Sequence, residues 1–193
     1  LFLYSEDFSN SFWTKAGATV VSGQSSPSSI SPLGAYKFVE DNANTLHAIY
    51  QNAGISLAVG VNTISIFVKA NGRDYFQIRT GSAGGITNAP LYANFNLINN
   101  TVTAQSTGAI TAEIKNISDG WKKVSVSFTV TSTSSVALVY QPITTPTAII
   151  AEQYLGDGTS GVYIFAAQLE LGSYPTSYIP TSGSSVTRNQ DQF

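Results

Sequence analysis

The stretch GDGTSGVYIFAAQLE at residues 156–170, followed by PTSYIPT at residues 175–181, decides the fold that we expect for this chain. Two glycines around Asp157 favour a tight turn, and the apolar residues after the turn alternate as they do in a β-strand. Two prolines then enclose Tyr178 and Ile179. The stretch therefore predicts a closing strand, followed by an anchor that holds the end of the chain against the domain.

The same alternation, with a period of two residues, recurs along the chain. Residues 63–69 (TISIFVK) alternate as in a half-buried strand, and the Asn71-Gly72 pair after them is a strong turn signal. Residues 74–80 (DYFQIRT) are therefore predicted to form the hairpin partner of that strand. Further strands are predicted at residues 35–39, 46–51, 121–130, 136–141 and 162–170.

Helical spacing does not persist anywhere, and polar loops separate the predicted strands, most clearly at residues 22–32 and 80–90. Many short strands of this kind predict an all-β fold, a single-domain antiparallel β-sandwich of the jelly-roll type. A length of 193 residues suits one such domain. We expect the sandwich module to cover residues 1–181 and residues 182–193 to form a C-terminal tail or linker.

The composition excludes several partners and sites. Only 10% of the residues are charged and the net charge is -2, so no basic field is available to hold nucleic acid. The absence of cysteine excludes disulfides and thiolate metal sites. No apolar run approaches the roughly 20 residues that span a bilayer, so we expect no membrane insertion. No signal peptide is recognisable, and the chain is expected to begin inside a longer protein.

Few residues could perform catalysis. His47 is the only histidine, so every triad that needs an imidazole base would have to use it. A glycosidase needs two carboxyl groups about 5–10 Å apart. The acids are scattered singly except for Glu6-Asp7 and Glu40-Asp41, and neighbours in a strand point to opposite faces. The sequence therefore predicts a protein that is not an enzyme.

Alternation also predicts which side chains leave the core. In residues 74–80 it places Tyr75, Gln77 and Arg79 on the outer face and leaves Phe76 and Ile78 for the core. The same reasoning, applied to the strands at residues 63–69 and 121–130, adds Phe67, Lys69, Trp121 and Lys123. If these strands lie side by side, one sheet presents aromatic rings among amide, guanidinium and ammonium donors.

Such a surface suits a sugar. The C–H face of a pyranose packs on an aromatic ring, while its hydroxyl groups bind planar side chains such as Arg, Asn and Gln. Tyr50, Tyr92 and Tyr140 would extend the platform if their strands reach it. The alternative is structural, because the same aromatic side chains could close the rim of the sandwich; Trp13 is assigned to the core.

Several short segments carry a family resemblance. They are residues 5–8 with Trp13, then 65–70, 95–97 with 101–102, 119–121, and 156–188. In this order they resemble a β-sandwich module of bacteriophage tail-fibre and other virion-associated proteins, which is similar to carbohydrate-binding modules. The resemblance implies a jelly roll on a virion or in an extracellular location, attached to a polysaccharide or cell-surface glycan. It also implies contacts with other virion protein domains and a homo-oligomer formed through the parent fibre.

The resemblance further implies a structural calcium, although no cofactor is required. Glu6 and Asp7 lie in the segment that supplies oxygen ligands to such an ion. Residues 166–167 are alanines, where an acid usually completes the site. The chain also departs from the family at Phe165, where a tryptophan is frequent, and at residues 122–123, where lysine replaces arginine.

Three functions remain open at this stage. The first is a non-catalytic, adhesin-type module that binds a glycan through the aromatic and polar sheet face. The second is a structural or assembly module of a virion, with the same face buried in an oligomer interface. The third is a fragment of a polysaccharide depolymerase.

Overall fold

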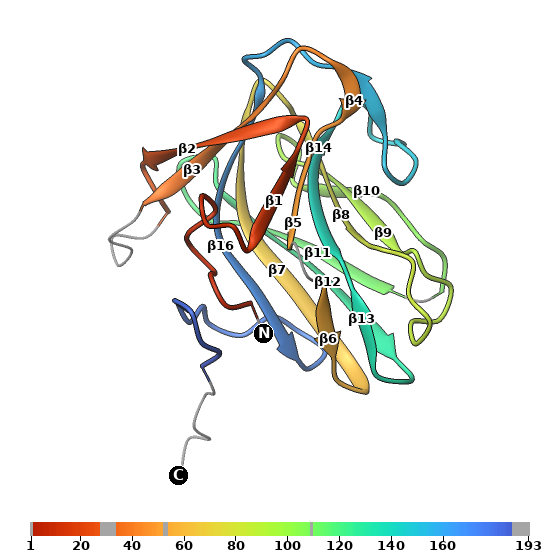
Figure 1. Ribbon diagram of the computed structural model, residues 1–193. Helices are drawn as coiled ribbons and strands as arrows, with labels where there is room; N and C mark the ends of the chain where they lie inside the picture. The colour runs from red at the N-terminus through yellow and green to blue at the C-terminus, as the bar shows by residue number, and fades with distance from the viewer. Residues whose placement is uncertain (1, 28–33, 52–53, 109, 187–193) are drawn as a thin grey trace.

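The computed structural model of the chain describes residues 2–27, 34–51, 54–108 and 110–186, and these residues form sixteen β-strands and no helix (Figure 1). This part of the chain thus contains no helix of the length and apolar character needed to cross a membrane. Two six-stranded antiparallel sheets make up most of the molecule, and two short strand pairs complete it.

The first sheet has the strand order β1-β5-β14-β8-β9-β10. Its strands are β1 (Trp13–Ala16), β5 (Ala48–Gln51), β14 (Leu138–Ile143), β8 (Tyr75–Thr80), β9 (Tyr92–Asn96) and β10 (Thr101–Gln105). The second sheet has the order β11-β12-β7-β16-β3-β2. Its strands are β11 (Ile110–Asn116), β12 (Lys122–Val130), β7 (Gly60–Asn71), β16 (Gly161–Leu171), β3 (Ala35–Glu40) and β2 (Ala18–Gln24). The short pairs are β4 (Asn44–Leu46) with β15 (Gln153–Leu155), and β6 (Ile55–Leu57) with β13 (Ser134–Val136).

The two large sheets pack face to face, and their inward side chains form one continuous core. Phe76 and Ile78 of β8 meet Ile64 and Ile66 of β7 in this core, and each is 1% exposed or less. Alternation along the strands produces this arrangement, because every second side chain points between the sheets. The predicted all-β antiparallel sandwich of the jelly-roll type is confirmed, and Trp13 lies in its core.

The predicted hairpin between residues 63–69 and 74–80 is wrong. β7 pairs with β12 on one side and with β16 on the other, so both of its edges are occupied. β8 lies instead between β14 and β9 in the opposite sheet. The Asn71-Gly72 turn therefore carries the chain from one sheet to the other. Gly72 forms an isolated parallel bridge with Gly161, whose carbonyl accepts the Arg73 N–H at 3.2 Å.

The other predicted strands are present with small changes. Residues 46–51 are divided by His47 into the end of β4 and the whole of β5, and residues 121–130 become β12. The predicted loop at residues 80–90 connects β8 to β9. The predicted loop at residues 22–32 begins within β2, and its residues 28–32 lie outside the described residues.

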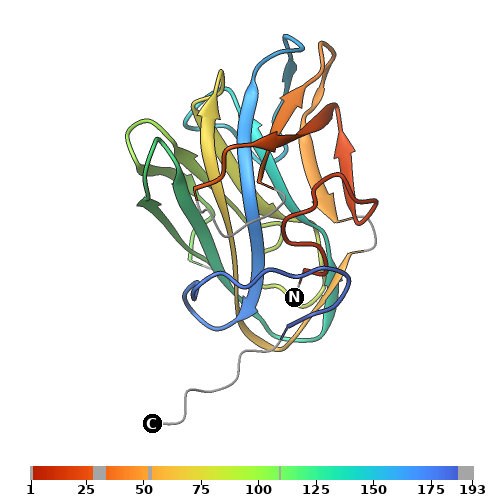
Figure 2. The same cartoon turned by 90° about the vertical axis from the view of Figure 1, so that its left-hand side faces the viewer.

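Residues 172–186 cross the outer face of the second sheet and run back to the N-terminal segment (Figure 2). Hydrogen bonds of 2.7–3.0 Å fix this strap to the sheet and to the N-terminal segment. They join Thr63 to Gly172, Lys123 to Thr176, Gln168 to Ile179 and Ser5 to Thr181. The predicted anchor after the closing strand is therefore confirmed, and we call residues 172–186 the C-terminal strap.

Candidate functional site

The nine residues predicted to bind a ligand lie on two faces that point in opposite directions. Those of the first sheet are Tyr50, Tyr75, Gln77, Arg79 and Tyr92. Those in or next to the second sheet are Phe67, Lys69, Trp121 and Lys123. Because the core separates the two outer faces, the two groups cannot form one platform. The expectation that Tyr75, Gln77 and Arg79 lie beside Trp121 is wrong.

The aromatic group of the second sheet is closed off by the chain itself. Trp121 is only 2% exposed, and it belongs to a small cluster on the outer face together with Phe165. Tyr163 and Tyr178 pack against this cluster, with the Tyr178 ring centroid 5.9 Å from that of Phe165. Tyr178 comes from the C-terminal strap, so the strap occupies the surface that a sugar would need.

The two lysines of the same face, Lys69 and Lys123, also lie against other parts of the chain. Lys123 donates a hydrogen bond to the Thr176 carbonyl at 2.8 Å and lies 5.6 Å from the centre of the Phe67 ring. Burial lowers the pKa of Lys123. Lys69 lies half-buried near Gly120 at the end of this face. These contacts hold the strap and the strand ends in place.

A row of four side chains crosses the outer face of the first sheet. Tyr50 is opposite Val139, Val139 opposite Arg79, and Arg79 opposite Tyr92 on successive neighbouring strands, so all four side chains share the face. With strands about 4.8 Å apart, the row extends about 14 Å from Tyr50 to Tyr92. Val139 is buried as its floor, while the other three remain partly exposed. We call this set the tyrosine–arginine row; Tyr75 lies outside it, at the other end of β8.

A loop covers the neighbouring part of the same face. Residues 144–152 follow β14, and the Ile149 carbonyl accepts a hydrogen bond from Gln77 at 3.4 Å. The Ala148 carbonyl accepts one from Asn94 at 2.8 Å. Gln77 is therefore fully buried, although alternation placed it correctly on the outward side. The open part of the face is the tyrosine–arginine row.

Arg79 is the chemical centre of this row. Its Nε donates to Oε1 of Gln141 at 3.0 Å, and this bond fixes the direction of the guanidinium. Burial lowers the pKa of Arg79, and the nearby Tyr50 hydroxyl acts against that shift. Among the described residues, Arg79 forms no ion pair, and the other guanidinium nitrogens have no hydrogen-bond partner.

Gln141 is a site residue that the sequence reasoning missed. It is 0% exposed, and its Nε2 has no hydrogen-bond partner among the described residues. Tyr140, expected to extend the sugar platform, points into the core and is also 0% exposed, which corrects that expectation. The strand predicted at residues 136–141 contained the signal, because its alternation places Val139 and Gln141 on the side opposite Tyr140.

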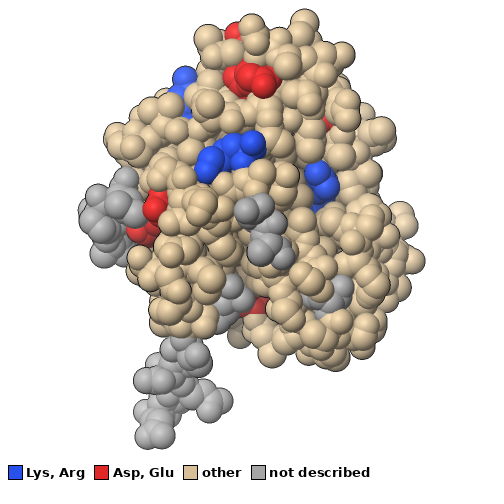
Figure 3. All heavy atoms as spheres, viewed as in Figure 1, with Lys and Arg blue, Asp and Glu red and all other residues tan. Residues whose placement is uncertain are grey.

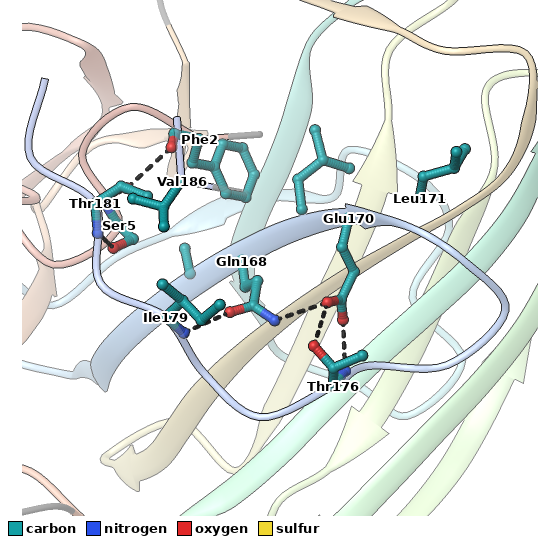
Figure 4. A pocket seen from close by; sticks show the side chains of 11 residues that line it. Phe2, Ser5, Gln168, Glu170, Leu171, Thr176, Ile179, Thr181 and Val186 are labelled. Atoms are coloured by element: carbon teal, nitrogen blue, oxygen red, sulfur yellow. Dashed lines mark hydrogen bonds between the residues drawn. The ribbon is translucent and has the colours of Figure 1, made fainter. Parts of the chain in front are cut away.

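A pocket of about 350 Å³ lies between β16, the C-terminal strap and the N-terminal segment (Figure 4). Its polar side chains are bonded to one another or to the strap. Glu170 accepts hydrogen bonds from the N–H and hydroxyl of Thr176 at 2.6 and 2.7 Å, and Gln168 accepts the Ile179 N–H at 3.0 Å. These groups fasten the strap, so the row on the first sheet is the better candidate for binding.

A buried polar cluster lies at the end of β3. Glu40 is 1% exposed, and its two carboxylate oxygens accept hydrogen bonds from the Arg73 guanidinium, the Tyr154 hydroxyl and the Asp157 N–H. Burial acts to raise the pKa of Glu40, but these hydrogen bonds together hold it below the ordinary value of 4.5. The carboxylate therefore fixes the turn that precedes β16.

His47 lies against this cluster. Its Nε2 is 3.1 Å from Oδ1 of Asp41, and its ring centroid is 4.4 Å from that of Tyr154. The side chain is fully buried, and its Nδ1 has no partner among the described residues. No hydroxyl group of that part of the chain is bonded to the imidazole, so a Ser–His–Asp geometry is not formed there.

The residues around Glu6 and Asp7 do not fit a calcium ion. Calcium takes six to eight oxygen ligands. Oδ1 of Asp7 already accepts the Ser9 and Asn10 N–H groups and the Tyr36 hydroxyl. Glu6 is buried near Tyr178. Within the described ranges, no three His, Cys, Asp or Glu side chains lie together as metal ligands would.

No family model matches the sequence, and no curated protein is significantly similar to it. A solved structure that resembles the chain contains the CBM22-1 and GH10 modules of the Clostridium thermocellum N-terminal endo-1,4-β-D-xylanase 10B, complexed with xylohexaose. The similarity has a TM-score of 0.46 and 12% identity, and covers 97% of this chain and 29% of that one. The chain thus spans less than a third of that structure, and this distant likeness says nothing about the site.

Proposed function

We propose that the protein is a non-catalytic module that binds a glycan along the tyrosine–arginine row of the first sheet. The observation that carries the proposal is Arg79, a partly buried guanidinium held by Gln141 between Tyr50 and Tyr92, with no ion-pair partner among the described residues. Two aromatic rings can pack on sugar C–H faces, while the guanidinium donates to the oxygens between them.

The surroundings support binding rather than catalysis. The row contains no acid and no histidine, and His47 and Glu40 are buried in the polar cluster at the end of β3. Charged atoms are sparse on the face seen in Figure 3, which accords with a ligand other than nucleic acid. The sequence resemblance is the sole support for placing the module on a phage tail or other virion surface, outside cells, next to other virion domains and in a fibre-linked homo-oligomer.

The structural alternative requires the aromatic face to be buried between chains. On the second sheet Tyr178 of the C-terminal strap packs against the buried cluster that contains Trp121 and Phe165, so that face needs no neighbouring chain to protect it. On the first sheet Tyr50 and Tyr92 remain partly exposed. These observations favour the glycan-binding proposal.

The two tyrosines are expected to contribute comparable shares of the affinity. Tyr50→Ala or Tyr92→Ala should weaken binding about 5- to 10-fold, the equivalent of one lost aromatic contact of about 1–1.5 kcal/mol. Affinity electrophoresis against a panel of bacterial and plant polysaccharides would identify a ligand, and titration calorimetry would give the ratios.

Tyr174→Ala is the matched control, because Tyr174 is 69% exposed on the C-terminal strap, over the opposite sheet. This variant should bind like the unmodified protein. An equal loss in all three variants, or wild-type protein that binds none of the polysaccharides, would contradict the proposal.

A further inference from the structure

Arg73, just before β8, and Arg79, near the other end of that strand, differ in how their charge is balanced. Arg73 donates one hydrogen bond to each carboxylate oxygen of the buried Glu40. Arg79 has only the neutral amide oxygen of Gln141, and no acid of the described residues pairs with it. Partial burial of a cation without an anion is unfavourable, so the missing negative charge is the feature to explain.

Further donors, and no acid, lie beside Arg79 in the row. Gln141 is completely buried, so its contribution is to hold the guanidinium through Oε1. The hydroxyl groups of Tyr50 and Tyr92 bond to no described residue. The centre of the row therefore offers several hydrogen-bond donors and no carboxylate acceptor.

We infer that the glycan carries a carboxylate, as uronic-acid sugars do, and that this carboxylate is bound between the two tyrosines by Arg79, whose guanidinium Gln141 holds from below. The inference rests on the proposed function and names the class of its ligand. A guanidinium presents two parallel N–H groups that match the two oxygens of a planar carboxylate, and its bond to Gln141 holds that fork in place. Tyr50 and Tyr92 are then placed to contact the sugar rings on either side.

The test compares polygalacturonate with the same polymer after reduction of its carboxyl groups to alcohols. Wild-type protein should bind the uronate polymer about 10- to 100-fold more tightly than the reduced polymer, because hydrogen bonds to a charged group are the stronger ones. Arg79→Gln should remove most of this preference, because it should weaken binding of the uronate polymer far more than binding of the reduced polymer. Affinity electrophoresis measures both ratios under the same conditions.

Lys115→Gln is the matched control. Lys115 lies on β11 of the opposite sheet, with its side chain 59% exposed, and the substitution removes the same single positive charge. Its uronate affinity should stay at the wild-type value. A melting curve for each variant would show that it is folded.

The outcomes separate the inference from the proposed function. If both polymers bind wild-type protein equally well, the protein binds glycans but the carboxylate inference is wrong. If dextran sulfate or poly-glutamate binds as tightly as polygalacturonate, or if Lys115→Gln weakens binding as much as Arg79→Gln does, general charge attraction explains the result and the inference is overturned. If the whole polysaccharide panel fails to bind, both proposals fail.

Discussion

Replacing Arg73 with methionine should destabilise the protein by about 3–5 kcal/mol, which is the usual range for breaking a buried ion pair by removing one partner. The side chain of Glu40 is 0% exposed, and Arg73 is the cation that faces it. Without Arg73, the donors that the described residues still offer to the carboxylate are the Tyr154 hydroxyl and the Asp157 N–H. For a chain of this length, the melting temperature should fall by about 6–20 °C.

The effect should also depend on pH in a specific direction. Hydrogen bonding and charge from Arg73 help to lower the pKa of Glu40 below 4.5 in the folded wild type, against the opposing effect of burial. The stability that results is present above pH 4.5 and is lost as the pH falls through the folded-state pKa. Removing Arg73 raises the folded-state pKa, so the difference between variant and wild type should shrink on acidification from pH 7 to pH 4.

Arg79→Gln provides the comparison for this prediction. Arg79 has no acid partner among the described residues, so its removal leaves no buried charge behind. We expect its stability to change by less than about 1 kcal/mol, with no marked dependence on pH between 4 and 7. Urea denaturation at each pH measures both variants. Similar losses for the two arginine substitutions would contradict the assignment of Glu40 as a carboxylate that depends on Arg73.

Alternation was enough to predict the sandwich and, in the strands without a bulge, the side of the sheet on which most of the candidate residues lie. Residues 63–69 alternate so regularly that their strand and its inward face follow directly from the sequence, whereas in residues 162–170 a bulge between Phe165 and Gln168 moves the inward positions from Val162 and Ile164 to Ala167 and Leu169. Trp121 and Gln77 do point outward as expected. Their burial could not be read from the pattern, because it depends on segments that fold back over them: the C-terminal strap over Trp121 and the loop at residues 144–152 over Gln77.

Strand pairing was the part that the sequence did not determine. A local signal such as Asn71-Gly72 predicts a hairpin from neighbouring residues alone, whereas both edges of β7 are taken by strands distant in sequence. β16 pairs with β7 although about ninety residues separate the end of β7 from the start of β16. Because this long-range pairing occupies the edge of β7, β8 lies in the other sheet. Because β7 and β8 lie in different sheets, the side chains that were predicted to form one sugar platform lie on two opposite faces.

Gly156, in the turn before β16, and Gly161, the first residue of β16, are among the most tightly packed glycines of the described residues. Gly161→Ala or Gly156→Ala should each destabilise the fold by more than about 3 kcal/mol, at or beyond the upper end of overpacking effects. A Cβ at residue 161 would lie 2.0 Å from the Phe38 carbonyl oxygen, and one at residue 156 would lie 1.9 Å from that of Asp41. Both obstacles are backbone atoms, so relief would require β3 or the residue that follows it to move away.

Such a movement would also disturb the charged cluster, because Gly161 is opposite Val39 in the β3–β16 pair and its carbonyl binds the Arg73 N–H. Gly84→Ala is the matched control, since nothing lies within 4 Å of a Cβ at residue 84 and the change should be close to neutral. Circular dichroism melting curves compare the three variants directly. If the Gly161→Ala protein is as stable as the Gly84→Ala protein, β3 and β16 are packed less closely at residue 161 than in the structure. The arrangement of Glu40 and Arg73, which depends on this contact, would then be wrong as well.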